Sequence, residues 1–361
     1  MLLKNNLSLR IINKKTSKLN TIKKWAVCLL ASLALFGCMS NNESTDTAKL
    51  ANKPLYRDTI YDGAADPVII WNKEENRWFM FYTNRRANIE VANEVDWVHG
   101  TPIGIAESTD GGASWQYRAN ANITYGKEDY TYWAPDVIED NGRYHMYLTV
   151  VPGTFSDWRH PRDIVHLTSD NLIDWKEESV LKLASDRVID AGVFKGEDDW
   201  WYMYYNNERD GKSIYSARSK DLYQWEDLGK AFNGQAGEGP KVFYWHDRYF
   251  MIIDHWDGLG VYSSVDLNEW QRQPDNILRE PGKGVDDGTK GLHADVVVQD
   301  DKAYIFYFTH PGRTAGNDGG AGAANDAYNV RRSSIQVAEL EFQDGVIHCD
   351  RDKPVYIQLK K

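Results

Sequence analysis

A unit of two apolar runs separated by a short polar turn recurs along the chain. It reads ADPVIIWNKEENRWFMFYT from Ala65, IDAGVFKGEDDWWYMYYNN from Ile189 and GEGPKVFYWHDRYFMIID from Gly237. Short runs that are rich in aromatic and β-branched residues and bounded by polar turns are typical of β-strands. Each unit therefore predicts an apolar strand paired with an aromatic-rich strand.

A third strand follows each hairpin and ends in a turn that closes on a tryptophan. The four turns are STDGGASW, SDNLIDW, SKDLYQW and SVDLNEW, and they end at Trp115, Trp175, Trp225 and Trp270. The steps between these tryptophans are 60, 50 and 45 residues, which is the spacing of four-stranded propeller blades. We expect the turn Asp to accept local backbone N–H bonds and the Trp to pack between neighbouring sheets.

Two further units bring the number of blades to five. They are WAPDVIEDNGRYHMYLTVV around Pro135 and HADVVVQDDKAYIFYFTH from His293. The last unit lacks the Trp turn and continues through SSIQVAELEF to the C-terminus, so we expect the segment before Asp66 to complete its outer sheet. The pattern predicts an all-β fold, one five-bladed β-propeller over residues 52–361.

The N-terminal segment predicts export. Its first 24 residues hold seven Lys and Arg and no acid, and an apolar stretch too short to span a bilayer follows. The segment LFGC resembles a bacterial lipobox, which implies a signal peptide over residues 1–37, an acylated Cys38 and a flexible tether over residues 38–51. The expected location is the cell envelope of a bacterium, and an ordinary cleaved signal peptide is the alternative.

The net charge and the cysteine content limit the classes of binding partner and exclude a disulfide. The formal net charge is −11, and removal of the basic leader would make it more negative. An acidic surface argues against nucleic acid and polyanionic glycans, but not against neutral sugars, and contact with a membrane is expected only through the lipid anchor. Of the three cysteines, only Cys349 lies in the folded body, which excludes an intramolecular disulfide there.

Two connections exceed the usual length and carry functional expectations. Residues 84–100 contain Arg and Trp, and we expect them to form a wall of the substrate site. Residues 311–330 are rich in Gly, Ala and Asn, and this composition is typical of a mobile lid or of a long connecting loop without a function of its own.

Three acidic residues and one histidine occupy equivalent positions at the starts of predicted inner strands, in blades one, three, four and five. These are Asp66, Asp190, Glu238 and His293, and inner strands line the axis of a propeller, so we expect the four side chains to meet in one pocket. Glycoside hydrolysis needs two carboxyl groups, one protonated and one ionised. A third carboxylate nearby raises the pKa of the acid, because like charges in a confined pocket resist double ionisation.

The order and spacing of the motifs at these positions resemble glycoside hydrolase family 43 and its five-bladed relatives. They are ADP in the first blade, WAPDV in the second, ID in the third, EGP in the fourth and GLH in the fifth. The resemblance implies that Asp66 is the general base, Asp190 the residue that modulates the pKa, and Glu238 the general acid, with inversion at the anomeric carbon. For such a reaction we expect the carboxyls of Asp66 and Glu238 to lie roughly 6.5 to 9.5 Å apart.

The same resemblance implies a role for two histidines. His293 matches a histidine near the propeller axis that often ligates a calcium ion or a water, and YFTHPG places His310 near the pocket. Some neoagaro-oligosaccharide hydrolases with this fold use a histidine as the acid, so His293 is an alternative to Glu238 in that role.

Aromatic and basic residues near strand ends are candidates for sugar binding. Trp133 and Trp256 could offer flat platforms for a sugar ring, with His255 beside them. Arg85 could donate hydrogen bonds to sugar hydroxyls or to a carboxylate. The expected substrates are oligosaccharides from plant or algal polysaccharides, with arabinose, xylose or galactose at a chain end or as a side chain.

Three other functions fit parts of the pattern. STDGGASW matches the Asp-box of sialidases, but those propellers have six blades and need three converging arginines, which the sequence does not reveal. A glycoside phosphorylase would need a basic phosphate site beside the pocket. A surface lipoprotein that binds sugars without turnover would have no use for a carboxyl of raised pKa.

Overall fold

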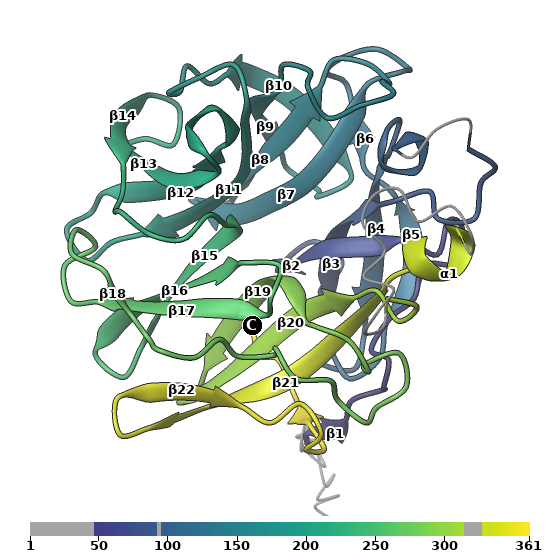
Figure 1. Cartoon of the computed structure of the whole chain (residues 1–361), viewed down its shortest axis with the longest axis vertical. Coiled ribbons are helices and arrows are strands. Elements are labelled where there is room, and N and C mark those ends of the chain that lie inside the picture. Colours follow the sequence, from purple (N-terminus) through teal and green to yellow (C-terminus); the bar gives the residue numbers. More distant parts are fainter. Residues whose placement is uncertain (1–46, 92–94, 314–326) are drawn as a thin grey trace, which may run out of the picture. The chain divides into compact units, whose positions relative to one another are not determined.

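Five antiparallel sheets surround a common axis in a computed structural model that describes residues 47–91, 95–313 and 327–361 (Figure 1). The all-β five-bladed propeller predicted from the repeats is confirmed. The predicted signal peptide, Cys38 and most of the tether lie outside the described residues, as does much of the loop 311–330.

Each blade runs from an inner strand to an outer one. The first blade comprises β2 (Ala64–Asn72), β3 (Arg77–Asn84), β4 (Ile103–Ser108) and β5 (Gln116–Asn120). The second comprises β7 (Thr131–Asp140), β8 (Arg143–Val151), β9 (Asp163–Ser169) and β10 (Asp174–Val180), with β6 (Asn122–Ile123) added in parallel to its edge. The third comprises β11 (Val188–Lys195), β12 (Trp201–Asn207), β13 (Ser213–Ser219) and β14 (Trp225–Lys230). The fourth comprises β15 (Glu238–Trp245), β16 (Arg248–Asp254), β17 (Leu259–Ser264) and β18 (Gln271–Arg272), and the fifth β19 (Leu292–Gln299), β20 (Lys302–Thr309), β21 (Ser334–Gln343) and β22 (Val346–Cys349).

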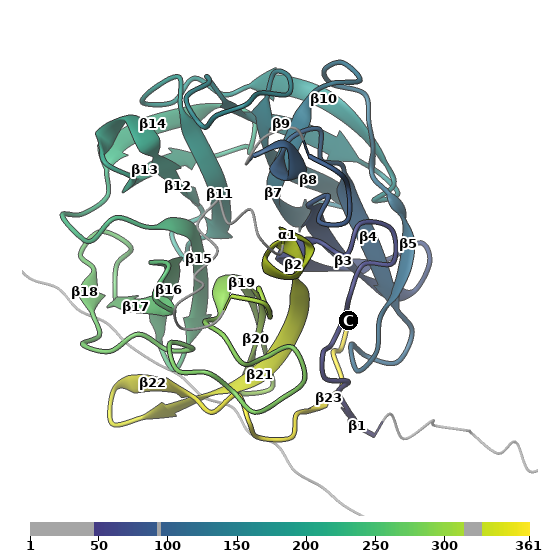
Figure 2. The same cartoon turned by 45° about the vertical axis from the view of Figure 1, so that its right-hand side comes forward.

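The five inner strands form a closed ring around the axis (Figure 2). Strand β2 lies beside β7 and β19, β11 lies beside β7 and β15, and β15 lies beside β19. A buried cation links all five. The ammonium of Lys241 on β15 contacts Asp136 on β7 at 2.7 Å and Asp295 on β19 at 3.1 Å. These carboxylates accept the backbone N–H groups of Val193 on β11 and Ile69 on β2.

The turns that end in tryptophan have the structural role expected of them. In the third blade, Ser219 Oγ accepts the N–H of Leu222, and Asp221 accepts two more N–H groups of the turn. Trp225 then packs edge-on against Tyr147 of the second blade, with ring centroids 5.4 Å apart. Trp175 and Trp270 make the same contact with Phe81 and Tyr204 of their preceding blades. In the second blade, Asn171 supplies the acceptor rather than Asp170.

The fifth blade closes differently from the expectation. Its fourth strand is β22, so the C-terminal chain completes the outer sheet and the segment before Asp66 does not. That segment instead bridges to β21 through Tyr56 and Ile335. Strand β1 (Lys49–Leu50) pairs with β23 (Tyr356–Ile357) in a separate two-stranded sheet, so residues 49 and 50, expected in the tether, form a short strand.

Helical structure is short throughout the described ranges. It consists of the 3₁₀ turns η1 (Asp96–Val98) and η2 (Glu208–Asp210) and the helix α1 (Ala327–Arg331). None of the helices that the structure describes has the length and apolarity to cross a membrane. The side chains around the mouth of the axis are therefore held mainly by strand ends, by loops and by these short 3₁₀ turns.

Candidate active site

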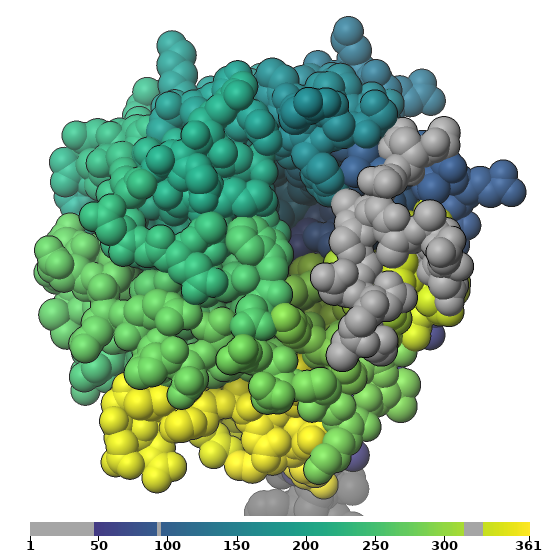
Figure 3. Space-filling view, viewed as in Figure 1, coloured from purple at the N-terminus to yellow at the C-terminus, as the bar shows by residue number. Residues whose placement is uncertain are grey.

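A cavity of about 550 Å³ opens at the mouth of the axis where the inner strands begin. Figure 3 shows a hollow near the centre of this face, between the teal and green blades. The acids Asp66, Asp190 and Glu238 all line the cavity, as the sequence predicts, whereas His293, expected with them, is not among its lining residues. Four of the candidate binding residues line it as well: Arg85, Trp133, Trp256 and His310.

A β-bulge at the start of each inner strand turns side chains toward the mouth. The strand registers shift at the same point in all five blades. The residue immediately after the last regular pair is Asp66, Ala134, Asp190, Gly239 and His293 in blades one to five, and the first four have positive φ angles between 39° and 60°. A bulge adds one residue outside the ladder and re-aims it.

Glu238 therefore does not stand at the same point as Asp66 and Asp190. It pairs with Asp254 one residue earlier, where the other blades have Ala65, Trp133, Ile189 and Leu292. Gly239 takes the bulged position of the fourth blade. The equivalence expected from the sequence was wrong by one residue for Glu238, although its side chain still lines the same cavity.

Asp66 is held as a carboxylate. Its side chain is buried, and Nη2 of Arg85 donates to both of its oxygens at 3.2 Å. Burial raises the pKa of Asp66, but Arg85, His293 and Thr83 together outweigh burial and lower the pKa well below its usual range. Asp66 is thus ionised at any pH at which the protein would work.

Asp190 and Asp254 are held in the opposite way. Burial raises the pKa of Asp190 to about 7. The positive charge of His293 lowers this pKa, and the negative charges of Glu238 and Asp66 raise it further. Burial and Glu238 likewise raise the pKa of Asp254 to about 7. Asp254 accepts the backbone N–H groups of Trp256 and His293, which fixes the start of β19 to the end of β16. Both carboxyls retain protons close to neutral pH.

Glu238 is ionised in the protein without substrate. Burial raises its pKa, but Lys212 Nζ, at 2.9 Å from Oε2, and the indole N–H of Trp256, which donates to Oε1 at 3.0 Å, lower the pKa below its usual value. Lys212 also lies 3.4 Å from Oε1 of Glu208. The ammonium therefore stands between two carboxylates.

His293 is an imidazolium that faces two of the acids. Its Nδ1 lies 3.5 Å from Asp66 and 4.0 Å from Asp190. Burial lowers the pKa of His293, but Asp66, Asp190 and Asp254 together raise it to about 9. The ring packs directly on Gly239, where an added Cβ would lie 2.4 Å from the imidazole. No group of three or more His, Cys, Asp or Glu in the described ranges is placed to hold a metal ion.

The two remaining candidate histidines differ in their placement. His310 is buried, and because the carbonyl of Arg332 can only accept, Nδ1 donates to it and Nε2 accepts from Arg85 at 3.2 Å. His310 thus holds the arginine that holds Asp66. His255 does not line the cavity, since its ring nitrogens contact Ala236 O and Tyr262 Oη within the fourth blade.

The tryptophans are fixed at their polar edges. Trp133 donates its indole N–H to the carbonyl of Val98, and the guanidinium of Arg162 lies 5.3 Å from its ring. Val98 belongs to the loop 84–100, so this loop does form part of the cavity wall. Trp256 is 40% exposed, and its indole N–H holds Glu238.

Sequence reasoning missed several lining residues. They include Trp158, Arg162, Arg187, Glu208, Lys212 and Asp254, which come from second strands and from connections between strands. Asp254 directly follows the apolar run FMII, and an acid at the end of a predicted strand could have indicated that it belongs to the site. The structure also gathers four arginines in the cavity, whereas the sequence revealed no converging set.

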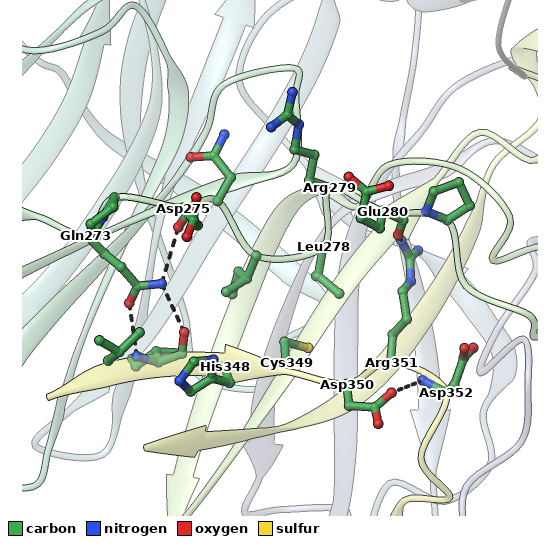
Figure 4. Close-up of a pocket in the computed structure, with 16 residues that line it drawn as sticks. Gln273, Asp275, Leu278, Arg279, Glu280, His348, Cys349, Asp350, Arg351 and Asp352 are labelled. Atoms are coloured by element: carbon green, nitrogen blue, oxygen red, sulfur yellow. Dashed lines mark hydrogen bonds between the residues drawn. The ribbon is translucent and has the colours of Figure 1, made fainter. Parts of the chain in front are cut away.

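A second cavity, of about 700 Å³, shares no lining residue with the first and lies beside strand β22 of the fifth blade (Figure 4). It is bounded by residues 273–281 and by β22 with the turn that follows. Cys349 lies there, and burial raises the pKa of its thiol to about 12, which makes it a poor nucleophile. The carboxyls Asp66, Asp190 and Glu238 are absent from its lining, so the candidate active site is the cavity at the mouth of the axis.

A comparison with protein-family models identifies the class to which this propeller belongs. Residues 36–283 match the family model described as "Probable glycosyl hydrolase domain", which is related to glycoside hydrolase family 43. The match covers more than half of the chain. The protein therefore belongs to this family of glycosyl hydrolase domains.

Curated relatives match over part of the chain. A protein named "Probable sucrose-6-phosphate hydrolase" from Vibrio cholerae is 29% identical over 155 residues, which are 37% of this chain and 28% of the relative. A "Fructan beta-fructosidase" from Streptococcus mutans is 26% identical over 186 residues, 43% of this chain and 13% of the relative. The matched segment thus spans less than a third of either relative.

Solved structures share the fold over most of the chain. A thermostable family-43 glycoside hydrolase has a TM-score of 0.60 at 18% identity, covering 85% of this chain and all of that one. A β-xylosidase/α-arabinofuranosidase from a compost metagenome, solved with xylotriose, has a TM-score of 0.58 at 14% identity, covering 83% of this chain and 97% of that one. A β-1,3-galactosidase of the same family has a TM-score of 0.59 at 14% identity, over 83% and 98% of the two chains.

Proposed function

We propose that the protein hydrolyses glycosidic bonds with inversion, with Asp66 as general base and Glu238 as general acid. The observation that carries the proposal is the meeting of Asp66, Asp190 and Glu238 in one cavity at the mouth of the axis. Family membership supports it. Arg85 and His293 keep Asp66 ionised, as a base that activates water must be.

The acid needs a proton that Glu238 lacks before substrate binds. Asp190 and Asp254 hold protons nearby because burial raises the pKa of both. Lys212 has a second partner in Glu208, at 3.4 Å. A shift of Lys212 toward Glu208 on substrate binding would release Glu238 to take up a proton, which it then delivers to the departing oxygen. Asp190 tunes this transfer through its own charge.

His293 is the second candidate for the acid. The observation in its favour is its charge, since the surrounding carboxylates overcome burial and raise its pKa to about 9. Glu238 and His293 can be distinguished as the acid by the activity that the variant of each retains. An aryl glycoside with a leaving group of low pKa needs no acid, so it should rescue the variant that lacks the acid.

The experiment compares Asp66→Asn, Glu238→Gln and His293→Asn on aryl glycosides and on oligosaccharides, with the anomer of the first product followed by NMR. We expect D66N to lose about a thousandfold in kcat/KM on all substrates, and E238Q to recover on activated aryl glycosides. Full activity of E238Q on oligosaccharides would refute its assignment as the acid. A retained anomeric configuration would refute inversion.

The substrate class proposed is a terminal or side-chain arabinose, xylose or galactose residue on plant or algal oligosaccharides. The family-43 neighbours support it, since two of them were solved with xylotriose and one with galactose. A glycoside phosphorylase or a non-catalytic sugar-binding protein would show phosphate-dependent turnover or binding without turnover, respectively. The five blades argue against a sialidase.

Export as a lipoprotein and a calcium ion on the axis stay proposals. Labelling with a fatty acid, abolished by Cys38→Ala, tests the first. For the second, Lys241 already supplies a cation on the axis. We therefore assign no step of the reaction to calcium, and chelation followed by calcium addition tests whether the ion affects stability or activity.

A further inference from the structure

Three cations surround a single carboxylate on one wall of the active-site cavity. Arg162 Nε lies 3.0 Å, Arg187 Nη2 3.6 Å and Lys212 Nζ 3.4 Å from the carboxylate oxygens of Glu208. Lys212 reaches onward to Glu238. Three positive charges thus share two carboxylates beside the proposed acid.

The cluster is built into the wall rather than exposed at the surface. The side chain of Arg162 is 2% exposed and lies over the ring of Trp133, whereas those of Arg187 and Lys212 are 17% and 37% exposed and line the cavity. Arg162 and Arg187 both donate to the carbonyl of Trp158, which fixes the two guanidinium groups side by side.

The charge of the cavity differs from that of the whole chain. Five cationic side chains line it: Arg85, Arg162, Arg187, Lys212 and Arg313. Five acidic side chains also line it, but two of them, Asp190 and Asp254, are held partly protonated by burial near neutral pH. Within this lining, Arg162, Arg187 and Lys212 place three positive charges on only two carboxylates, Glu208 and Glu238, whereas the chain as a whole carries −11.

An excess of positive charge is unfavourable for the proposed reaction. The transition state of glycoside hydrolysis resembles an oxocarbenium ion and carries positive charge at the sugar. The cluster of Arg162, Arg187 and Lys212, with three positive charges against two carboxylates, raises its energy. A negative group on the substrate would remove this cost, and paired guanidinium groups suit a carboxylate, sulfate or phosphate.

We propose that the natural substrate carries one anionic group, a uronic acid carboxylate or a sulfate or phosphate ester, which binds against Arg162, Arg187 and Lys212. This inference rests on the proposed glycosidase function and narrows its substrate class. A single anionic group on the substrate is compatible with the negative net charge of the chain, which argues only against polyanionic glycans. By competing for Lys212, the group would also weaken the ion pair that keeps Glu238 ionised.

Binding to the inactive variant D66N tests the proposal separately from turnover. The probes are matched sugars: glucuronic acid against glucose, galacturonic acid against galactose, and galactose 6-sulfate and 6-phosphate against galactose, with inorganic phosphate and sulfate as free anions. We expect at least one anionic member to bind about tenfold or more tightly than its neutral partner, and the preference to fall with added salt.

Substitutions of the cluster test where the anionic group of the sugar binds. Arg187→Gln should abolish most of the preference, and Arg187→Lys, which retains the charge but loses the planar fork, should retain part of it. The control is Arg209→Gln, an exposed arginine of the adjacent η2 that pairs with Asp186 outside the cavity. R209Q should keep the full preference.

Equal or tighter binding of the neutral sugars, or a preference that R187Q leaves unchanged, would overturn the proposal. So would turnover that requires inorganic phosphate, because the cluster would then hold the attacking anion. Preferential binding of an anionic sugar by D66N with no hydrolysis of any glycoside by the wild type would instead refute the glycosidase assignment and leave the anion site standing.

Discussion

Nδ1 of His293 lies 3.5 Å from Oδ1 of Asp66 and 4.0 Å from Oδ2 of Asp190. One imidazolium therefore lies beside two carboxyls, of which Asp66 is ionised and Asp190 retains a proton near neutral pH. In His293→Asn that positive charge is lost, and the pKa of Asp66 and of Asp190 should rise together. The acidic limb of the kcat/KM profile, which reports ionisation of the base, should move up by about one pH unit. An unchanged limb with normal folding would show that Arg85 alone sets the charge of Asp66.

Stability should fall as pH rises through the range in which Asp190 loses its proton. Its pKa is raised from 3.8 to about 7 in the folded protein. Between these values the folded state binds a proton that the unfolded state lacks, so folding is favoured at low pH and this contribution is lost above about 7.

Asp190→Asn should remove this dependence. We expect D190N to equal the wild type at pH 5 and to exceed it at pH 8 by roughly 1–4 kcal/mol in free energy of unfolding. Urea titrations at several pH values measure this difference. A variant whose deficit grows with pH would contradict the assignment of the protonated carboxyl to Asp190.

Gly239 should matter for activity beyond its backbone conformation. Its φ is 60°, and a Cβ there would lie 2.4 to 2.7 Å from atoms of the His293 imidazole. Gly239→Ala should therefore displace His293 and lower kcat/KM by about tenfold or more. The matched control is Gly229→Ala, with φ of 81° and open space around its Cβ. Both variants should lose about 1 kcal/mol of stability through the positive φ angle, G239A should lose more because of the overlap with His293, and only G239A should lose activity.

Lys241 should be among the most sensitive positions for stability. In Lys241→Met, two buried carboxylates, Asp136 and Asp295, lose their shared cation, which should cost about 3–5 kcal/mol. Lys302→Met breaks a half-exposed pair with Glu339 and should change stability by less than about 1 kcal/mol. Chemical denaturation measures both. The triple variant with Asn at both acids should recover part of the loss, because no charge is then left unpaired.

The sequence predicted the five blades because apolar runs, polar turns and the four Trp turns each repeat visibly. It also predicted three of the five acids that line the cavity, Asp66, Asp190 and Glu238, but not Glu208 or Asp254. It misplaced Glu238 by one residue because the bulge that shifts it is a backbone feature, set by φ angles that Asp66 and Asp190 adopt despite their side chains. Arg162, Arg187 and Lys212 could not be foreseen, since connections of different length bring them to the wall and no repeat marks them.

The five bulges bear on how the residues around the mouth of the axis can change in evolution. A residue in a bulge makes no rung of the ladder, so its side chain can be replaced while the hydrogen bonds of its blade persist. The residues there are Asp, Ala, Asp, Gly and His. Each blade thus offers one position at which a single substitution adds or removes an acid, a base or free space. New chemistry could arise on this scaffold by steps that leave its folding intact.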